Sequence, residues 1–258
     1  MTHNQLDKAL YQAMKVAAKQ RKIKLSAERN IYKKVDPYFF GSHYHLHSVM
    51  EEMVYIELRM SVKYHRFDEL QYGIISPNGQ LRFTDKIRAN SGAMCNANHP
   101  RVKQPFPFDG TLEALPKLCD DILDFLEKYY TDFLTMVEND YGDLNGYFIA
   151  HMDEQPRLAG LAYLDKGDYQ GAITCFMHPN MDGANSIWAV DIHTDEQRRR
   201  AKASGVKILS STYGEGIHRS RRDQFVDYAI ALQNGLDWNA ERAFYGLLPE
   251  EREGVCIG

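Results

Sequence analysis

Residues 54–64 read Val-Tyr-Ile-Glu-Leu-Arg-Met-Ser-Val-Lys-Tyr, with an apolar or aromatic side chain at every even position. The odd positions carry Tyr55, Glu57, Arg59, Ser61 and Lys63. Because successive side chains of a strand point to opposite faces, this alternation predicts a half-buried β-strand. Tyr44 and Leu46 share an apolar side in the preceding segment. We therefore expect residues 42–48 to be the antiparallel hairpin partner, joined to this strand through residues 49–52.

Helical patterns lie on both sides of this sheet. Before it, Leu6, Leu10 and Met14 recur at helical spacing, and after it residues 118–137 show a second helical face. The intervening residues 90–110 hold three glycine or proline clusters and predict a long loop. We therefore expect an α+β fold, with a helix and an antiparallel sheet in residues 1–108 and a mainly helical region in residues 111–258. The two regions either form separate domains or pack as one.

Residues 157–176 read Arg-Leu-Ala-Gly-Leu-Ala-Tyr-Leu-Asp-Lys-Gly-Asp-Tyr-Gln-Gly-Ala-Ile-Thr-Cys-Phe and predict a helical hairpin. Small Gly160 allows two helices to approach, Gly167-Asp168 turns the chain, and Phe176 lies on the returning helix. This stretch resembles one tetratricopeptide helix pair. No second copy follows at a spacing of about 34 residues, so a solenoid of about three stacked repeats is not predicted.

A second resemblance concerns the N-terminal half. Its order of elements, together with residues 54–61, is similar to a bacterial α+β domain of unknown function. This resemblance contains no diagnostic motif and implies no function.

The C-terminal part of the chain predicts short strands among helices. Residues 186–192 have the pattern of a strand, Thr194 to Gln197 has that of a capping box, and residues 205–209 that of a helix stop followed by a second strand. Together they predict a small β-α-β passage. We interpret residues 213–216, Tyr-Gly-Glu-Gly, as a flexible loop.

The composition limits the classes of function. A net charge of −4 on 258 residues provides no overall attraction to nucleic acid or to anionic membranes. The four cysteines form no CxxC pair, which argues against a zinc ribbon, a redox centre or a disulfide framework. No stretch approaches the roughly 18 consecutive apolar residues of a membrane span. The first predicted helix carries Asp7 among its apolar positions, whereas a signal peptide would have a continuous apolar run there. We expect a soluble, cytoplasmic protein without a membrane partner.

His43, His45 and His47 alternate along the predicted first strand of the hairpin. On a strand their imidazoles would project from one face at a spacing of roughly 6–7 Å. A register that places His45 opposite Glu57 would bring two histidines and a carboxylate near one divalent cation, with zinc the first choice. The alternatives are a polar sheet face that binds no metal, another ligand, or a pH-sensing role.

Basic residues gather in residues 198–222, including Arg199, Arg219 and Arg222. Such a cluster is suited to a phosphate group or to nucleic acid. The alternative is a solvated helix face, with Asp195 and Glu196 as ordinary salt-bridge partners.

The sequence holds no complete nucleophile or phosphate-loop motif, so whether the protein is an enzyme stays open. The leading hypothesis is a non-catalytic intracellular binding or regulatory protein with a protein partner. Its partner surface would be the polar face of the sheet or the groove beside the helical hairpin, with Tyr163 and Tyr169 as candidate binding residues. The rival hypothesis is a metal-dependent enzyme, most plausibly a hydrolase, in which His43, His45 and either His47 or Glu57 hold the cation.

Overall fold

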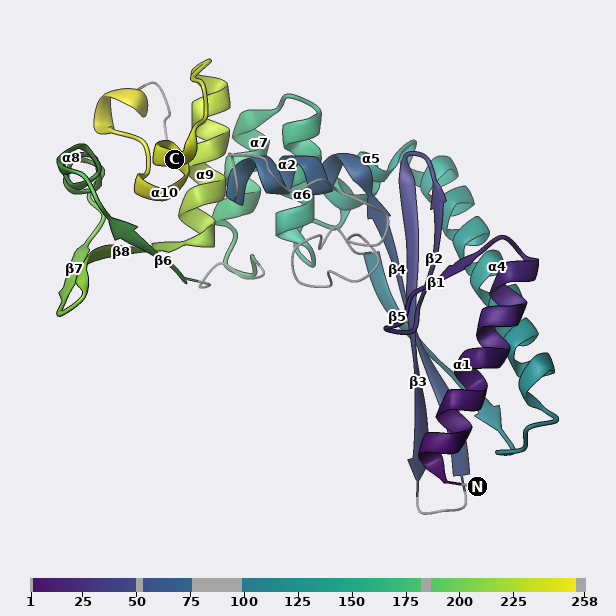
Figure 1. The fold of residues 1–258 in the computed structure, drawn as a ribbon. Helices are drawn as coiled ribbons and strands as arrows, with labels where there is room; N and C mark the ends of the chain where they lie inside the picture. Colours follow the sequence, from purple (N-terminus) through teal and green to yellow (C-terminus); the bar gives the residue numbers. More distant parts are fainter. Residues whose placement is uncertain (1, 50–52, 76–98, 182–186, 254–258) are drawn as a thin grey trace. The chain divides into compact units, whose positions relative to one another are not determined.

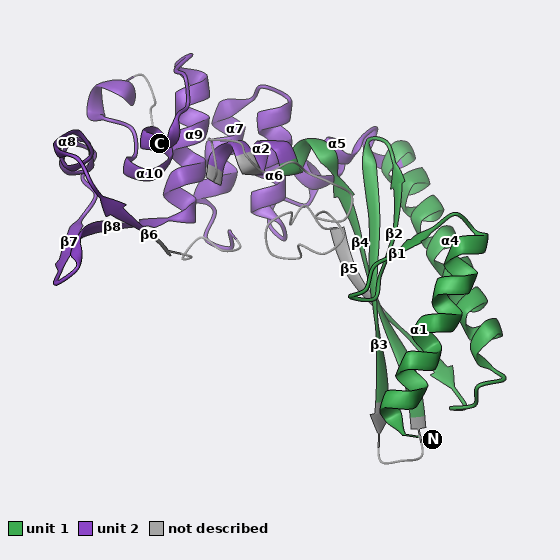
Figure 2. Cartoon of the chain, viewed as in Figure 1, with its two compact units in different colours: residues 1–68, 82–139 green, residues 69–81, 140–258 purple. Residues whose placement is uncertain are grey.

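The computed structural model describes residues 2–49, 53–75, 99–181 and 187–253 (Figure 1). It has the predicted α+β fold, with an N-terminal helix and an antiparallel sheet followed by a mainly helical half. The chain forms two compact units, residues 1–68 with 82–139 and residues 69–81 with 140–258 (Figure 2). Within the described ranges, no helix combines the length and apolarity that crossing a membrane requires.

The first unit contains a five-stranded antiparallel sheet in which the strands follow their sequence order. Its strands are β1 (Lys24–Leu25), β2 (Asn30–Val35), β3 (Tyr38–Val49), β4 (Met53–Tyr64) and β5 (His99–Phe108). The predicted hairpin is confirmed, because β3 pairs with β4 and sets His45 opposite Glu57. The connecting residues 50–52 lie outside the described part of the chain.

One face of this sheet forms the core of the first unit. Ile56, Leu58 and Met60, on the apolar side of β4, are fully buried or nearly so, and each such side chain contributes about 1.5–3 kcal/mol to the free energy of folding. The helices α1 (His3–Gln20) and α4 (Leu115–Tyr141) lie on this side of the sheet (Figure 1). Tyr130 of α4 stacks on Phe40 with ring centroids 4.3 Å apart.

Two differences from the sequence prediction concern residues 90–141. The predicted loop is a strand over residues 99–108, where Pro105 and Pro107 are tolerated because β5 is an edge strand. Pro105 and Pro107 are two residues apart, so their missing N–H groups lie on the same side of the strand. The predicted division after residue 108 also shifts, because α4 packs on the sheet and belongs mainly to the first unit. Residues 90–98 lie outside the described ranges.

The second unit is built mainly of helices. They are α5 (Leu144–Ala150), α6 (Pro156–Asp165), α7 (Tyr169–Met177), α8 (Asp195–Ala203), α9 (Arg221–Gln233) and α10 (Ala240–Tyr245), with a 3₁₀ turn, η1, at Pro249–Glu251. The helix α2 (His65–Ile75) contains the division between the units near residue 68. α5 packs on α6, α6 on α7, and α7 on α9.

The predicted hairpin of residues 157–176 is the pair α6 and α7. A Cβ at Gly160 would lie 2.8 Å from Cζ of Phe176, so the close approach of the helices requires glycine there. Gly167 has a φ of 75°, and the Asp168 carboxylate accepts the Gly171 N–H at 2.9 Å and caps α7. Phe176 also meets Phe225 of α9 edge-on, with centroids 5.0 Å apart. The hairpin is thus one packed layer of the second unit.

A three-stranded antiparallel sheet completes the second unit, with the order β6 (Ile187–Ile192), β8 (Gly214–Ser220), β7 (Ile208–Ser211). The predicted strands and the Thr194 capping box are present. The predicted flexible loop at residues 213–216 is different, because residues 214–216 belong to β8, which pairs with both neighbours. Ile192, Ala201, Ile217 and Tyr245 form a small core beneath this sheet.

Candidate functional site

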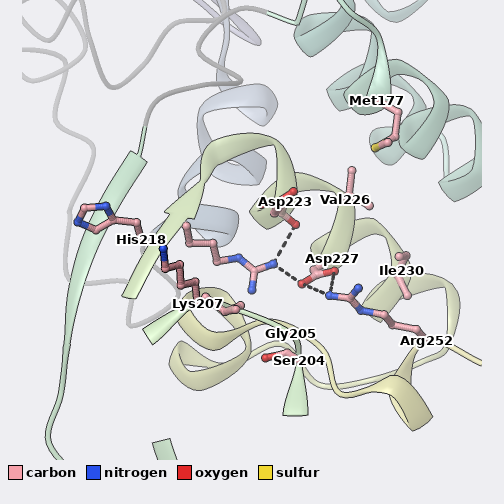
Figure 3. Close-up of a pocket in the computed structure, with 12 residues that line it drawn as sticks. Met177, Ser204, Gly205, Lys207, His218, Asp223, Val226, Asp227, Ile230 and Arg252 are labelled. Atoms are coloured by element: carbon pink, nitrogen blue, oxygen red, sulfur yellow. Dashed lines mark hydrogen bonds and ion pairs between the residues drawn. The ribbon is translucent and has the colours of Figure 1, made fainter. Parts of the chain in front are cut away.

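A cavity of about 430 Å³ lies in the second unit, between β8, α9 and the segment that follows α8 (Figure 3). Gly205, with a φ of 75°, ends α8 and turns the chain, so that Ser204 and Lys207 line one wall. β8 contributes His218 and Arg219. α9 contributes polar Asp223 and Asp227 together with apolar Val226 and Ile230, and Met177 and Arg252 complete the lining.

Arg219 and Asp227 form a buried ion pair in the wall of this cavity. The Nη2 group of Arg219 donates to Oδ2 of Asp227 and, at 3.1 Å, to the carbonyl of Asp223. The two side chains are only 2% and 4% exposed. Asp227 also accepts the Leu247 N–H at 3.1 Å and pairs with Arg252 at 3.1 Å. The carboxylate of Asp227 therefore connects β8, α9 and the C-terminal segment.

The guanidinium of Arg219 is not fully satisfied. Its Nε and Nη1 atoms are buried and have no hydrogen-bond partner in the described part of the chain. Gly246 packs against this guanidinium, and a Cβ there would clash with Nη1. The close packing holds Arg219 in a fixed position.

The mouth of the cavity carries more accessible groups. Lys207 and His218 are exposed, and the side chain of Arg252 is 42% exposed. Figure 3 shows His218 directed away from the Asp227 carboxylate, whereas Arg252 is directed towards it. Three cationic side chains, Lys207, Arg219 and Arg252, outnumber the two carboxylates of the lining, so the cavity carries a positive charge at neutral pH.

Of the three arginines predicted to bind a ligand, only Arg219 lines this cavity. Arg199 lies on the exposed side of α8, where it pairs with Glu196 at 2.6 Å, as the solvated-face alternative predicts. Arg222 donates to the carbonyl of His178 at 3.4 Å. The neighbours Arg198 and Arg200 pair with Glu215 and Glu251. Much of the basic cluster is therefore neutralised by local carboxylates.

Sequence reasoning missed Asp227 and Arg252. The available signal was the position of Asp227 between apolar Val226 and the run Ala229, Ile230, Ala231, because a carboxylate on an apolar helix face needs a cationic partner. Arg252 could not be found in this way, because nothing near it in the sequence indicates where the C-terminal segment packs.

The two tyrosines predicted at the helical hairpin are half-buried. Tyr163 packs against Gly171, where a Cβ would lie 2.6 Å from Cδ1 of the ring, and burial raises the pKa of its phenol. Tyr169 begins α7. Tyr163 thus helps to pack the hairpin.

The three predicted histidines share one face of the first unit's sheet, but they do not form one cluster. The rings of His43 and His45 lie 4.1 Å apart, whereas those of His45 and His47 lie 6.1 Å apart. His47 instead stacks on Tyr55 at 4.9 Å. Glu57 accepts from Nε of Arg59 at 2.6 Å and lies 4.0 Å from Nε2 of His47.

The environment of the sheet favours the neutral form of His43 and His45. Burial, followed by the nearby charges of His45 and Arg59, lowers the pKa of His43 to about 4. Burial is also the main cause that lowers the pKa of His45. Nδ1 of His43 lies 2.8 Å from Oδ1 of Asn30.

The predicted ligand set of His43, His45, His47 and Glu57 is not assembled around one point. Across the described ranges, no group of three or more His, Cys, Asp or Glu side chains is arranged to hold a metal ion. The physical reason is that the His47 ring stacks on Tyr55, while Glu57 pairs with Arg59.

Burial raises the pKa of the Cys119 and Cys175 thiols to about 12, which keeps them protonated.

No family model, curated protein sequence or solved structure matches the chain.

Proposed function

We propose that this chain is a non-catalytic binding protein whose ligand carries an anionic group, phosphate or carboxylate, and binds in the cavity at Arg219. The observation that supports the proposal most directly is the buried Arg219 guanidinium, two of whose nitrogens have no hydrogen-bond partner in the described structure. A buried donor without a partner costs about 1–3 kcal/mol, and more when the group is charged. An anion close to this guanidinium would offset part of that cost.

Lys207 and Arg252 provide the direct contacts in this proposal. Both line the cavity and are accessible to solvent, whereas Arg219 lines the same cavity and is buried. Low-dielectric surroundings make a buried charge act more strongly on a nearby anion than an exposed one. The ligand would thus be held by two accessible cations and attracted by a third.

Part of the lining is apolar. Met177, Val206, Val226 and Ile230 present hydrocarbon to the cavity. Ligand pockets commonly combine an apolar wall with a small number of convergent polar groups. We therefore expect an anionic ligand with an apolar portion, in preference to a bare ion.

The hydrogen bonding of Asp227 favours binding over catalysis. This carboxylate accepts from Arg219, Arg252 and the Leu247 N–H, so its oxygens are occupied by donors. A general base must have a free lone pair within reach of the substrate proton. Asp227 serves to orient the arginines.

A protein partner that binds at the 157–176 hairpin stays a separate prediction. It is independent of ligand binding in the cavity.

The test is isothermal titration of the full chain with inorganic phosphate and with acetate. We expect binding to the wild type, with Lys207→Gln weakening it roughly 10-fold or more, since a charged hydrogen bond contributes about 1.5–3 kcal/mol. Lys202→Gln is the matched control. Lys202 is an exposed residue of α8 that does not line the cavity, so this substitution removes one positive charge outside the proposed site. It should bind as the wild type does.

Thermal unfolding provides an independent measurement. A ligand at 100 times its Kd should stabilise the protein by about 2.7 kcal/mol. Equal loss of phosphate binding in Lys207→Gln and Lys202→Gln would show a general charge effect and contradict the proposed site. Absence of binding by both anions to the wild type would reject the function itself.

A further inference from the structure

The histidines of β3 show a pairing that regular strand geometry alone does not produce. Side chains at positions i and i+2 of a strand stand roughly 6–7 Å apart. The His45 and His47 rings keep nearly this spacing, at 6.1 Å, but the His43 and His45 rings lie only 4.1 Å apart. The first two imidazoles have therefore turned towards one another.

A hydrogen bond orients one ring of this pair. Asn30 belongs to the neighbouring strand β2 and is directly opposite His43 of β3. Oδ1 of Asn30 lies 2.8 Å from Nδ1 of His43. Because an amide oxygen only accepts, Nδ1 of His43 must carry the proton, and in the neutral ring the lone pair is on Nε2. Metal-binding histidines are commonly oriented by a hydrogen bond of this kind from the other ring nitrogen.

The charges near the two rings include two arginines, Arg29 and Arg59, which add to the effect of burial and lower the pKa of both His43 and His45. Arg59 is directly opposite His43 on β4, and its cation would repel a metal ion. Its Nε donates to the Glu57 carboxylate at 2.6 Å, so that the repulsion is partly cancelled. Glu57 is in turn directly opposite His45.

We infer that His43 and His45 form a two-imidazole site for a divalent late transition-metal ion, with zinc and nickel as the probes and Asn30 as a positioning residue. Imidazole nitrogen is a preferred ligand for both ions. Zinc takes about four ligands, so two protein nitrogens leave positions for water or for an external ligand. This site differs from the predicted four-ligand set, because it excludes His47 and Glu57. It is independent of the anion cavity, which belongs to the other compact unit.

The experiment titrates the full chain, purified without a polyhistidine tag, with zinc and then nickel, and follows binding calorimetrically. We expect about one equivalent of metal per chain, and a decrease in affinity of at least roughly 10-fold in His45→Ala and in His43→Ala. His47→Ala is the matched control on the same strand face and should retain the wild-type affinity. Circular dichroism melts check that each variant is folded. If His43→Ala unfolds, His45→Ala still tests the site, because no side-chain hydrogen bond of His45 is seen in the described structure.

The positioning role of Asn30 has its own readout. Asn30→Ala should weaken binding roughly 10–100-fold and change the ¹⁵N shifts of His43 towards a mixture of tautomers before metal is added. A purely structural role would leave the tautomer unchanged. Metal binding that survives in the His43→Ala/His45→Ala double variant would overturn the inference, and so would an equal loss in His47→Ala or no binding at all by the wild type.

Discussion

Asp227 shows how one buried charge depends on several partners. Its carboxylate pairs with Arg219 and Arg252 and accepts the Leu247 N–H. Buried ion pairs contribute little net stability relative to apolar residues, but removal of one partner leaves the other charge unpaired in a poorly solvated place. The contacts of Asp227 with Arg219, Arg252 and Leu247 therefore fix the arrangement of β8, α9 and the C-terminal segment more than they stabilise the fold.

Asp227→Asn should lower the free energy of unfolding by about 3–5 kcal/mol, because the neutral amide leaves the Arg219 guanidinium without a counter-charge. Urea denaturation measures this change. Asp195→Asn is the control, because the Asp195 carboxylate is 97% exposed and its solvated pair with Arg198 should contribute little to stability. Equal losses in the two variants would contradict the structural role of the Arg219 pair.

His43 makes stability depend on pH. Its folded-state pKa is lowered to about 4 from an ordinary value of 6.5, mainly by burial. Between these two pH values the unfolded chain binds the proton and the folded chain does not. The contribution of His43 is therefore complete above pH 6.5 and is lost as the pH falls towards about 4.

We expect the free energy of unfolding to decrease from pH 6.5 to pH 4 with a smaller slope in His43→Gln than in the wild type. Glutamine retains a donor for Asn30 but does not titrate. Denaturant midpoints measured across this range provide the comparison. Identical slopes in the two proteins would show that His43 titrates normally in the fold.

At the level of elements, the α6–α7 hairpin depends on the absence of one methyl group. Any Cβ at Gly160 would lie 2.8 Å from Cζ of Phe176 and closer still to neighbouring ring atoms. The ring cannot retreat freely, because its other side meets Phe225. The same substitution in α2 meets no such obstacle, since a Cβ at Gly73 would lie at an ordinary 3.5 Å from the Tyr228 hydroxyl.

Gly160→Ala should destabilise the protein by about 1–3 kcal/mol, as expected for overpacking. Gly73→Ala is the matched control and should instead stabilise it by up to about 1 kcal/mol, because alanine is the better helix former. Thermal melts of both variants test the difference in sign. Two stabilised variants would mean that α6 and α7 are further apart than described.

The element that sequence reasoning misread most clearly is β5. Its prolines indicate a loop when the segment is considered alone, because proline lacks the N–H that a central strand needs. An N–H on the open side of an edge strand has no partner in any case. Edge position is a property of the assembled sheet, so the local sequence could not provide it.

At the scale of the whole molecule, the chain divides into two compact units whose contacts are mainly internal. Hydrogen exchange in Asp227→Asn should therefore accelerate for amides of β8 and α9 and change little for those of β3 and β4. Mass spectrometry of peptic fragments from the full chain measures both sets. Equal acceleration in the two units would show that they unfold as one cooperative body.

The sequence by itself determined the α+β class, the β3–β4 hairpin and the α6–α7 hairpin. Each follows from periodicity or from glycine and capping positions, which act over a few residues. Tertiary structure alone decided that α4 belongs with the sheet, that His43 and His45 pair without His47, and that Arg252 reaches Asp227. These outcomes depend on contacts between segments far apart in the sequence, such as Arg252 with Asp227, and such contacts form only when those segments pack together.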